Sequence, residues 1–254
     1  MKWLRFAHRG EIGFGTLVGT QVHRHEGDLF DAPRPTGQAL DVADLEWLAP
    51  VVPGKYVGLW NNFRAAAEKN GWTPPADPLY FLKSPDCLSA HGQPIPVPAS
   101  YGGRVFFEGE RAVVVGRRAR AVSVDEARAH IFGYACANDV TALELLTRDP
   151  AFPQWSRAKS FDAFGALGPV IETDFDPAAG HLRTLVEGRE RQNYALADMF
   201  FSPAELVSRI SHDMTLMPGD VILCGTSLGA LPMRAGSRVE VVIDGIGTLS
   251  NVYG

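Results

Sequence analysis

Two glutamates lie two positions apart in an apolar segment that runs from Val105 to Val115. Successive side chains of a strand point to opposite faces, so a strand here would place Glu108 and Glu110 on the same face. Two neighbouring carboxylates raise each other's pKa, and burying them unpaired is costly. A bound cation removes both penalties, and oxygen ligands favour magnesium, manganese or calcium over zinc. An exposed strand face with two solvated glutamates would show the same pattern.

Two further residues could belong to the same site. Asp139 closes the apolar segment 133–139, where an Asn-Asp pair is more typical of a turn but could supply a third carboxylate. Lys159 is either a solvated charge or a cation that stabilises a developing enolate or carboxylate beside the metal. His23 and His25 could bind a metal from one side of an extended chain, although a surface hairpin turn explains them better. Each of these signals is weak when taken singly.

The composition excludes several classes of protein. A formal net charge of −5 over 254 residues, with no run of Lys and Arg, argues against a nucleic-acid partner. No segment reaches the roughly 18 apolar residues of a membrane span, and the first residues lack the apolar core of a signal peptide. Three scattered cysteines without a CxxC pair argue for a reducing compartment. We therefore expect a soluble, cytoplasmic protein without a membrane partner.

The elements that would position these residues are mostly short strands. The 26 glycines and 18 prolines divide the chain into many short segments, which indicates strands and turns. We expect strands at 2–8, 12–19, 55–60, 79–82, 105–115, 134–140, 221–224, 238–243 and 247–252. We expect short helices at 64–70, closed by Gly71, from Ser123 to Gly133, and from Ser202 to Asp213, the last two opened by capping boxes. A small N-terminal region is expected to end near Pro53.

Taken together, these segments resemble the motifs of the fumarylacetoacetate hydrolase superfamily. The stretch 107–116 is similar to the family's aromatic-Glu-x-Glu strand, and 133–139 to its Gly-Tyr-x-x-x-Asn-Asp segment. The family's remaining elements are matched by Lys159–Asp162, Gly168-Pro169, Pro218–Asp220, Gly225-Thr226 and Gly245–Gly247. The order and spacing match from about Val57 to the end of the chain. Family members include 2-hydroxyhepta-2,4-diene-1,7-dioate isomerases and 5-carboxymethyl-2-oxo-hex-3-ene-1,7-dioate decarboxylases.

The resemblance implies an α+β, β-rich fold, a mixed β-roll with a few short helices. A small N-terminal β region, residues 1–53, would precede a catalytic domain at 54–254, and the protein would be a homodimer. The site would hold magnesium or manganese, with calcium also suitable. The resemblance assigns Glu108, Glu110 and Asp139 as metal ligands, Lys159 as the residue near the reacting carbonyl, and Gln192, Thr226 and Lys83 as substrate-binding residues.

Two positions depart from the family pattern. Arg64 stands where many members carry a histidine that activates water, and Leu143 stands where many carry an arginine. An arginine cannot act as a base at neutral pH, but it could clamp a carboxylate through two hydrogen bonds. These two departures therefore put hydrolysis in question, because hydrolysis needs a group that activates water.

The leading hypothesis is a divalent-metal enzyme acting on a small 2-oxo or 2-hydroxy-enoic acid or diacid. It would cleave a carbon–carbon bond, by hydrolysis or decarboxylation, through an enolate stabilised by the metal, in the breakdown of an aromatic compound. One alternative is a double-bond isomerase or tautomerase of a 2-hydroxy-dienedioate. Another is a non-catalytic relative that binds metal and ligand, and metal-dependent turnover would separate it from the enzymes.

Overall fold

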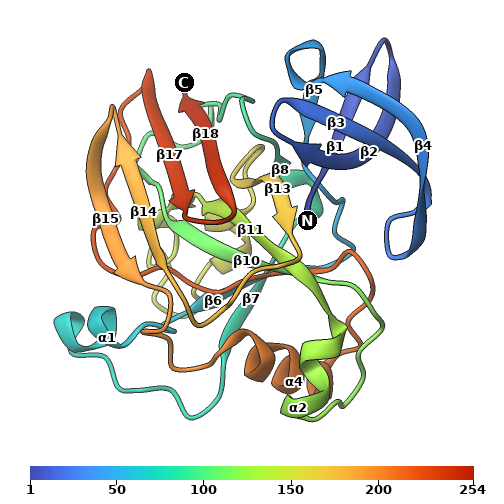
Figure 1. Ribbon diagram of the computed structural model, residues 1–254. Helices are drawn as coiled ribbons and strands as arrows, with labels where there is room; N and C mark the ends of the chain where they lie inside the picture. The colour runs from blue at the N-terminus through green and yellow to red at the C-terminus, as the bar shows by residue number, and fades with distance from the viewer.

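The computed structural model describes residues 1–254 and is built mainly of strands, as the α+β, β-rich prediction expected. A long sheet runs in the order β4-β3-β2-β1-β13-β11-β10-β16-β6-β7, with β5 added on β1 and β8 added on β13. A four-stranded sheet in the order β15-β14-β17-β18 and the small pair β12-β9 complete the strands. Figure 1 shows the N-terminal strands at one end of the molecule and the four-stranded sheet beside the central strands.

The N-terminal strands extend the long sheet. They are β1 (Lys2–His8), β2 (Glu11–Val18), β3 (Gln21–Asp28), β4 (Asp31–Asp41) and β5 (Glu46–Leu48). The hairpin expected around Gly10 is confirmed, and β1 continues the sheet by pairing Trp3 with Ile171 of β13 (Gly165–Glu172). The turn expected at His23 and His25 is wrong, because both residues lie within β3. The His25 ring packs edge-on against the Trp3 ring, with 4.8 Å between the ring centroids. This contact packs β3 against β1.

The central strands carry the buried part of the sheet. They are β11 (Ile131–Asp139), β10 (Gly109–Val115), β16 (Val221–Leu223), β6 (Tyr56–Trp60), β7 (Leu79–Lys83) and the short β8 (Leu88–Ser89). Every residue of β10 and β13 is buried, including Glu110 and Arg111 of β10 and Glu172 at the end of β13. The strand expected at 134–140 is confirmed as part of β11, so Asn138 and Asp139, a pair that is also typical of turns, are buried strand residues.

The strand expected from 105 to 115 is interrupted. Val105–Phe106 form β9, which pairs with β12 (Thr141–Ala142), and β10 begins only at Gly109. Between them the Glu108 N–H donates to the Asn138 side chain at 3.0 Å instead of joining a ladder. Glu108 therefore lies at a break in the strand and Glu110 is the second residue of β10, yet their carboxylate oxygens lie within 4.8 Å of each other, as a shared face predicted.

The helices are short and begin or end at clear local signals. They are α1 (Arg64–Asn70), α2 (Val124–Ala127), α3 (Trp155–Lys159) and α4 (Pro203–Asp213), with 3-10 turns at Val42–Asp44, Pro85–Cys87, Arg128–His130 and Leu143–Leu145. Gly71 closes α1 with a φ of 67°, and both expected capping boxes are present. The helix expected to reach Gly133 ends at Ala127, because β11 already begins at Ile131. No helix has both the length and the apolar character needed to cross a membrane.

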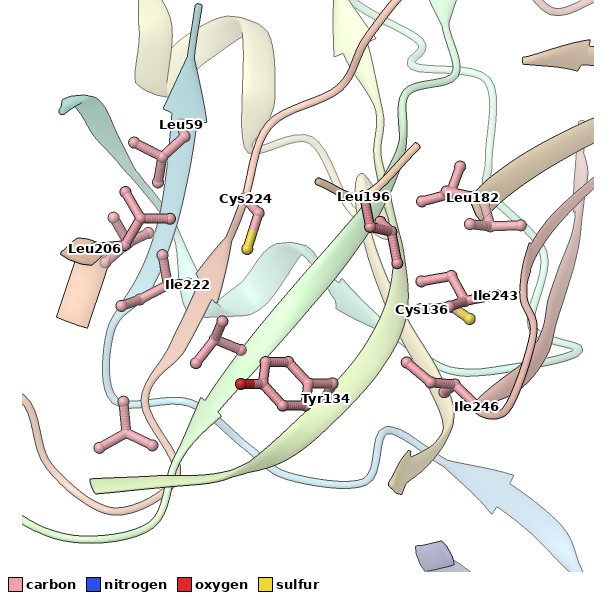
Figure 2. Close-up of a cluster of buried hydrophobic side chains, with 14 of the residues drawn as sticks. Leu59, Tyr134, Cys136, Leu182, Leu196, Leu206, Ile222, Cys224, Ile243 and Ile246 are labelled. Carbon is pink, nitrogen blue, oxygen red and sulfur yellow. The ribbon is translucent and has the colours of Figure 1, made fainter. Parts of the chain in front are cut away.

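The four-stranded sheet and α4 cover the central strands. The sheet consists of β14 (His181–Val186), β15 (Arg189–Ala195), β17 (Ser237–Ile243) and β18 (Gly247–Tyr253). The expected hairpin at Asp244-Gly245 joins β17 to β18. Figure 2 shows part of the core cluster, in which Leu206 of α4, Ile222 of β16 and Ile243 of β17 belong to one buried group. This packing fixes the strand ends from which the candidate site is built.

Candidate active site

Three carboxylates meet where β10 begins and β11 ends. Ligand oxygens of Glu108, Glu110 and Asp139 all lie within 4.8 Å of one another. Antiparallel pairing of β10 with β11 places Gly109 opposite Asn138, which brings the two glutamates beside Asp139. The structure thus brings together the three residues that the sequence analysis named as metal ligands.

Glu110, like Asp139, is fully buried. One of its oxygens, Oε2, accepts a hydrogen bond from the Gly225 N–H at 2.7 Å. The other oxygen, Oε1, is buried and has no hydrogen-bond partner. Burial, and then the charge of Asp139, raises the pKa of Glu110 well above its usual value. A buried carboxylate oxygen without a donor is costly, which indicates that a cation belongs beside it.

Two lysines compensate part of the negative charge. The Lys159 Nζ lies 2.7 Å from Asp139 Oδ2 and 3.0 Å from Glu108 Oε2. Lys83 pairs with the other oxygen of Asp139 and donates to the Phe164 carbonyl at 3.1 Å. Burial raises the pKa of Asp139, but Lys159 and Lys83 outweigh burial and hold that pKa below its usual value. Burial lowers the pKa of Lys159, but the surrounding carboxylates outweigh it and raise that pKa.

The donor set fits a hard divalent cation. With all three carboxylates ionised, as metal ligands must be, they and the two ammonium groups leave one net negative charge in a buried cluster. The unpartnered Oε1 of Glu110 supplies a free ligand atom in that cluster. Oxygen-only ligands suit magnesium, manganese or calcium, as the sequence predicted.

Gln192 and Thr226 lie next to the carboxylates. Gln192 is 1% exposed, and its amide donates to Thr226 Oγ1 at 2.9 Å. Its Oε1 accepts hydrogen bonds from Gly109 N at 3.0 Å and from Thr184 at 2.8 Å. Both ends of this side chain are therefore occupied by protein atoms. Thr226, in contrast, lines the cavity described next.

A cavity of about 410 Å³ opens beside the cluster. It is lined by 18 residues, 11 of them hydrophobic, and Glu108 and Lys159 are the charged ones. β6, α1, β7 and α3 each contribute a wall residue, respectively Trp60, Ala66, Phe81 and Trp155. The carboxylates and Lys159 thus lie at a cavity large enough for a small organic acid.

Arg64 and Leu143 lie in different places relative to this cavity. Leu143 lines it. Arg64 does not, because its guanidinium packs 4.7 Å above the Phe200 ring and lines a separate cavity of about 580 Å³. The structure therefore does not bring Arg64 to the carboxylate cluster.

A family model described as "Fumarylacetoacetate (FAA) hydrolase C-terminal" matches residues 55–252. The chain belongs to the fumarylacetoacetate hydrolase family. A second model, "Rv2993c-like, N-terminal", matches residues 1–50. Members of the family include isomerases, decarboxylases and hydrolases, so an enzymatic role follows at the level of the family.

Three similar proteins illustrate this fumarylacetoacetate hydrolase relationship. Protein Rv2993c of Mycobacterium tuberculosis is 40% identical over 246 residues, covering 95% of this chain and 90% of that protein. The oxaloacetate tautomerase YisK of Bacillus subtilis is 36% identical over 190 residues, covering 71% and 62%. A crystal structure of 2-hydroxyhepta-2,4-diene-1,7-dioate isomerase from Mycobacterium marinum superposes with a TM-score of 0.91 at 36% identity, covering 100% and 98%.

Several residues of this fumarylacetoacetate hydrolase site were not found from the sequence. Thr141 donates to Glu108 Oε1, and Asn138 accepts from the Glu108 backbone at 3.0 Å. Asn61 and Ser227 line the cavity. Thr141 and Asn138 flank Asp139 in the chain, so their proximity was a usable signal. Ser227 directly follows the predicted Thr226 and so gave the same kind of signal, whereas Asn61 gave none, because only the folded chain brings it to the cavity.

Proposed function

We propose that this chain is a divalent-metal-dependent enzyme that interconverts the keto and enol forms, or shifts the double bond, of a small 2-oxo acid. The observation that carries the proposal is the Lys159 ammonium, 2.7 Å from Asp139 and 3.0 Å from Glu108 at the wall of the cavity. The tautomerase and isomerase names of two relatives, each 36% identical, support the same class of reaction.

Glu108, Glu110 and Asp139 would hold magnesium or manganese in this proposal. When bound, such an ion supplies a Lewis acid that increases the acidity of the C3 hydrogens of a chelating 2-oxo acid. The chain's own contribution is to keep the three carboxylates together against their mutual repulsion. It does so through the backbone N–H of Gly225 on Glu110 and the two lysines on Asp139.

Lys159 would act as a hydrogen-bond donor. Because the surrounding carboxylates raise its pKa, Lys159 is protonated at neutral pH and cannot remove a proton from carbon. Its ammonium can instead donate to the oxygen on which negative charge develops, in a site that is largely shielded from water. The proton that leaves C3 would pass to water in the cavity, the enol oxygen would gain a proton from the Lys159 ammonium, and that water would return its proton to Lys159.

The lining of the cavity favours this chemistry over hydrolysis. Hydrolysis of a carbon–carbon bond needs a group that deprotonates water. No histidine lines the cavity, and its one carboxylate, Glu108, is assigned to the metal. Decarboxylation would start from an acid with a second carboxylate, for which the cavity has no free cation. Tautomerisation or isomerisation needs no attacking water and no second carboxylate, and the proton that it removes from C3 passes to water in the cavity.

Deuterium exchange tests this proposal directly. Incorporation of deuterium at C3 of 2-oxo acids in D2O would be followed by proton NMR with added magnesium. The controls contain no added metal or contain a chelator. We expect metal-dependent exchange that falls by about 100-fold or more in Glu110→Gln, the loss typical of a removed catalytic interaction. Glu190→Gln, at an exposed position of β15, is the matched control. Equal exchange by wild type and Glu110→Gln would contradict the proposal, and a product of reduced mass would indicate cleavage.

The homodimer implied by the family resemblance stays a prediction. Light scattering of the purified chain at several concentrations tests it. A mass of about twice 27.6 kDa is the expected result.

A further inference from the structure

Two buried oxygens at the catalytic cavity have no hydrogen-bond partner. They are Asn61 Oδ1 and Ser227 Oγ, and both residues line the cavity. Asn61 is 8% exposed and Ser227 is 5% exposed, so water does not readily satisfy them. Neither oxygen has appreciable accessible surface, so a ligand donor reaches it only after a small movement of the neighbouring side chains. Unpaired buried oxygens are rare and costly, which favours such a movement, and the Ser227 hydroxyl can accept the bond as Asn61 Oδ1 does.

The Asn61 side chain is held in one orientation. Its Nδ2 donates to the Thr73 carbonyl at 3.0 Å. Reversing the amide would place Oδ1 against that carbonyl oxygen, so the unpartnered atom is the acceptor. The backbone of Asn61 has a φ of 55°, a left-handed conformation that asparagine tolerates better than most residues. The position thus presents a fixed acceptor, and a carboxylate placed there would meet another oxygen.

The cavity also lacks a free positive charge. Lys159 is the only cationic residue in its lining, and Asp139 and Glu108 already pair with it. Leu143 adds an apolar side chain to the lining. A second carboxylate on the substrate would therefore enter a largely apolar space without a partner, which is unfavourable.

Aromatic side chains form much of the wall. The Trp60 and Trp72 rings lie 5.1 Å apart, and Phe81 stacks on Trp155 at 4.9 Å. All four rings line the same cavity. Such a wall favours a flat apolar or aromatic body through burial and ring–ring contacts.

We propose that the cavity selects 2-oxo acids with a single carboxylate and an uncharged aromatic or apolar tail that carries a hydrogen-bond donor, recognised by Asn61 and Ser227. The assignment of the 2-oxo group to the metal end rests on the proposed function. The selectivity for the tail rests on the cavity alone, so binding can test it separately from turnover.

Tryptophan fluorescence provides a binding test, because Trp60, Trp72 and Trp155 line the cavity. The wild-type chain with magnesium would be titrated with 4-hydroxyphenylpyruvate, phenylpyruvate and oxaloacetate. We expect 4-hydroxyphenylpyruvate to bind about tenfold more tightly than oxaloacetate, and about fivefold more tightly than phenylpyruvate, as one hydrogen bond predicts. The preference over phenylpyruvate should disappear in Ser227→Ala. Tighter binding of oxaloacetate than of both aromatic acids would overturn the proposal.

A gain of function strengthens this test. Leu143→Arg would place a cation in the cavity lining, and Leu143→Met is its matched uncharged control. We expect oxaloacetate to bind about tenfold more tightly to Leu143→Arg than to wild type, with no such change in Leu143→Met. If oxaloacetate affinity were the same in all three proteins, the argument from missing charge would be wrong.

Deuterium exchange with the same three acids separates the two proposals. Exchange that is fastest with oxaloacetate would leave the proposed reaction intact and overturn the selectivity. Preferential binding of the aromatic acids without any exchange would overturn the reaction and leave the selectivity intact.

Discussion

Gln192 Oε1 accepts a hydrogen bond from the N–H of Gly109 at 3.0 Å. Gly109 is the residue between the two glutamates of the carboxylate cluster. The amide end of Gln192 donates to Thr226 Oγ1 at 2.9 Å, and Thr226 donates to the Gly109 carbonyl at 2.9 Å. Gln192 therefore joins the start of β10 to the loop after β16, and we infer that it positions the cluster without contacting the substrate.

Replacing Gln192 should lower both the stability of the fold and the affinity of the site for magnesium. Gln192→Ala leaves the buried N–H of Gly109 without its acceptor, so we expect the free energy of unfolding to fall by about 1–3 kcal/mol. Magnesium affinity should fall too, because Glu108 and Glu110 flank the released residue. Urea denaturation and calorimetric metal titration measure the two effects.

Asn193→Ala is the control for this prediction. Asn193 is the next residue of β15, is exposed, and bonds only to the exposed side chains of Glu190 and His181. Asn193→Ala should leave both the free energy of unfolding and the magnesium affinity almost unchanged. Unchanged metal affinity in Gln192→Ala would contradict the positioning role.

Lys83 should be needed for stability because its partner is buried. The Lys83 ammonium and the Asp139 carboxylate are both 0% exposed. Lys83→Met removes one of the two cations on that carboxylate, and we expect a loss of about 3 kcal/mol in the free energy of unfolding. Adding Asp139→Asn to this variant should recover part of the loss, because the uncompensated charge disappears.

Lys69→Met provides the matched comparison for the lysine. Lys69 lies on the exposed side of α1 and forms no ion pair. Urea denaturation at neutral pH should show almost no change in this variant. A loss in Lys83→Met no larger than in Lys69→Met would show that the buried pair contributes little.

Local signals in the sequence predicted the elements that depend on neighbouring residues. Ser202, Pro203 and Glu205 fixed the start of α4, and Gly71 fixed the end of α1, because capping acts within one turn. The hairpin at Asp244-Gly245 was likewise visible in a few residues. The three carboxylates were assigned to one site from the order of the family's motifs along the sequence, and not from a geometric argument.

Several strands were missed, among them β13, whose partner β1 is distant in the chain, and the adjacent strands β14 and β15. No strand was expected at β13, although β1 pairs Trp3 with Ile171 across most of the chain. β14 and β15 alternate polar and apolar residues only weakly, and their pairing through Thr184 and Gln192 is visible only in the fold. The break at Glu108 depends on Asn138, thirty residues away, so no local pattern could have shown it.

Magnesium should stabilise the folded chain through the carboxylate cluster. A ligand that binds only the native state adds about 2.7 kcal/mol at 100 times its Kd, so the melting temperature should rise with added magnesium. Glu110→Gln should abolish that rise, because it removes a carboxylate from the set of three. Glu190→Gln should retain it. Equal rises in all three proteins, measured by differential scanning calorimetry, would place the cation elsewhere.

Glu144 should give the chain a pH-dependent stability in acid. Its carboxylate accepts hydrogen bonds from Tyr101 and, at 2.7 Å, from Arg104, which lower the pKa of Glu144 to about 2. A depressed pKa stabilises the fold above the ordinary carboxyl range and loses that stabilisation as the pH falls toward 2. The side chain is 40% exposed, so the contribution should be about 1 kcal/mol or less.

The difference in unfolding free energy between wild type and Glu144→Gln isolates this effect. Urea denaturation at pH 7, 5, 4 and 3 should give a difference that is constant from pH 7 to 5 and shrinks below it. Glu68→Gln, at an exposed position of α1, controls for the loss of a carboxylate without these partners. A difference between wild type and Glu144→Gln that stays constant down to pH 3 would show that Tyr101 and Arg104 do not stabilise the ionised form. Such a result would also remove the reason for the depressed pKa of Glu144, because that pKa falls only if both donors bind the charged carboxylate more strongly than the neutral acid.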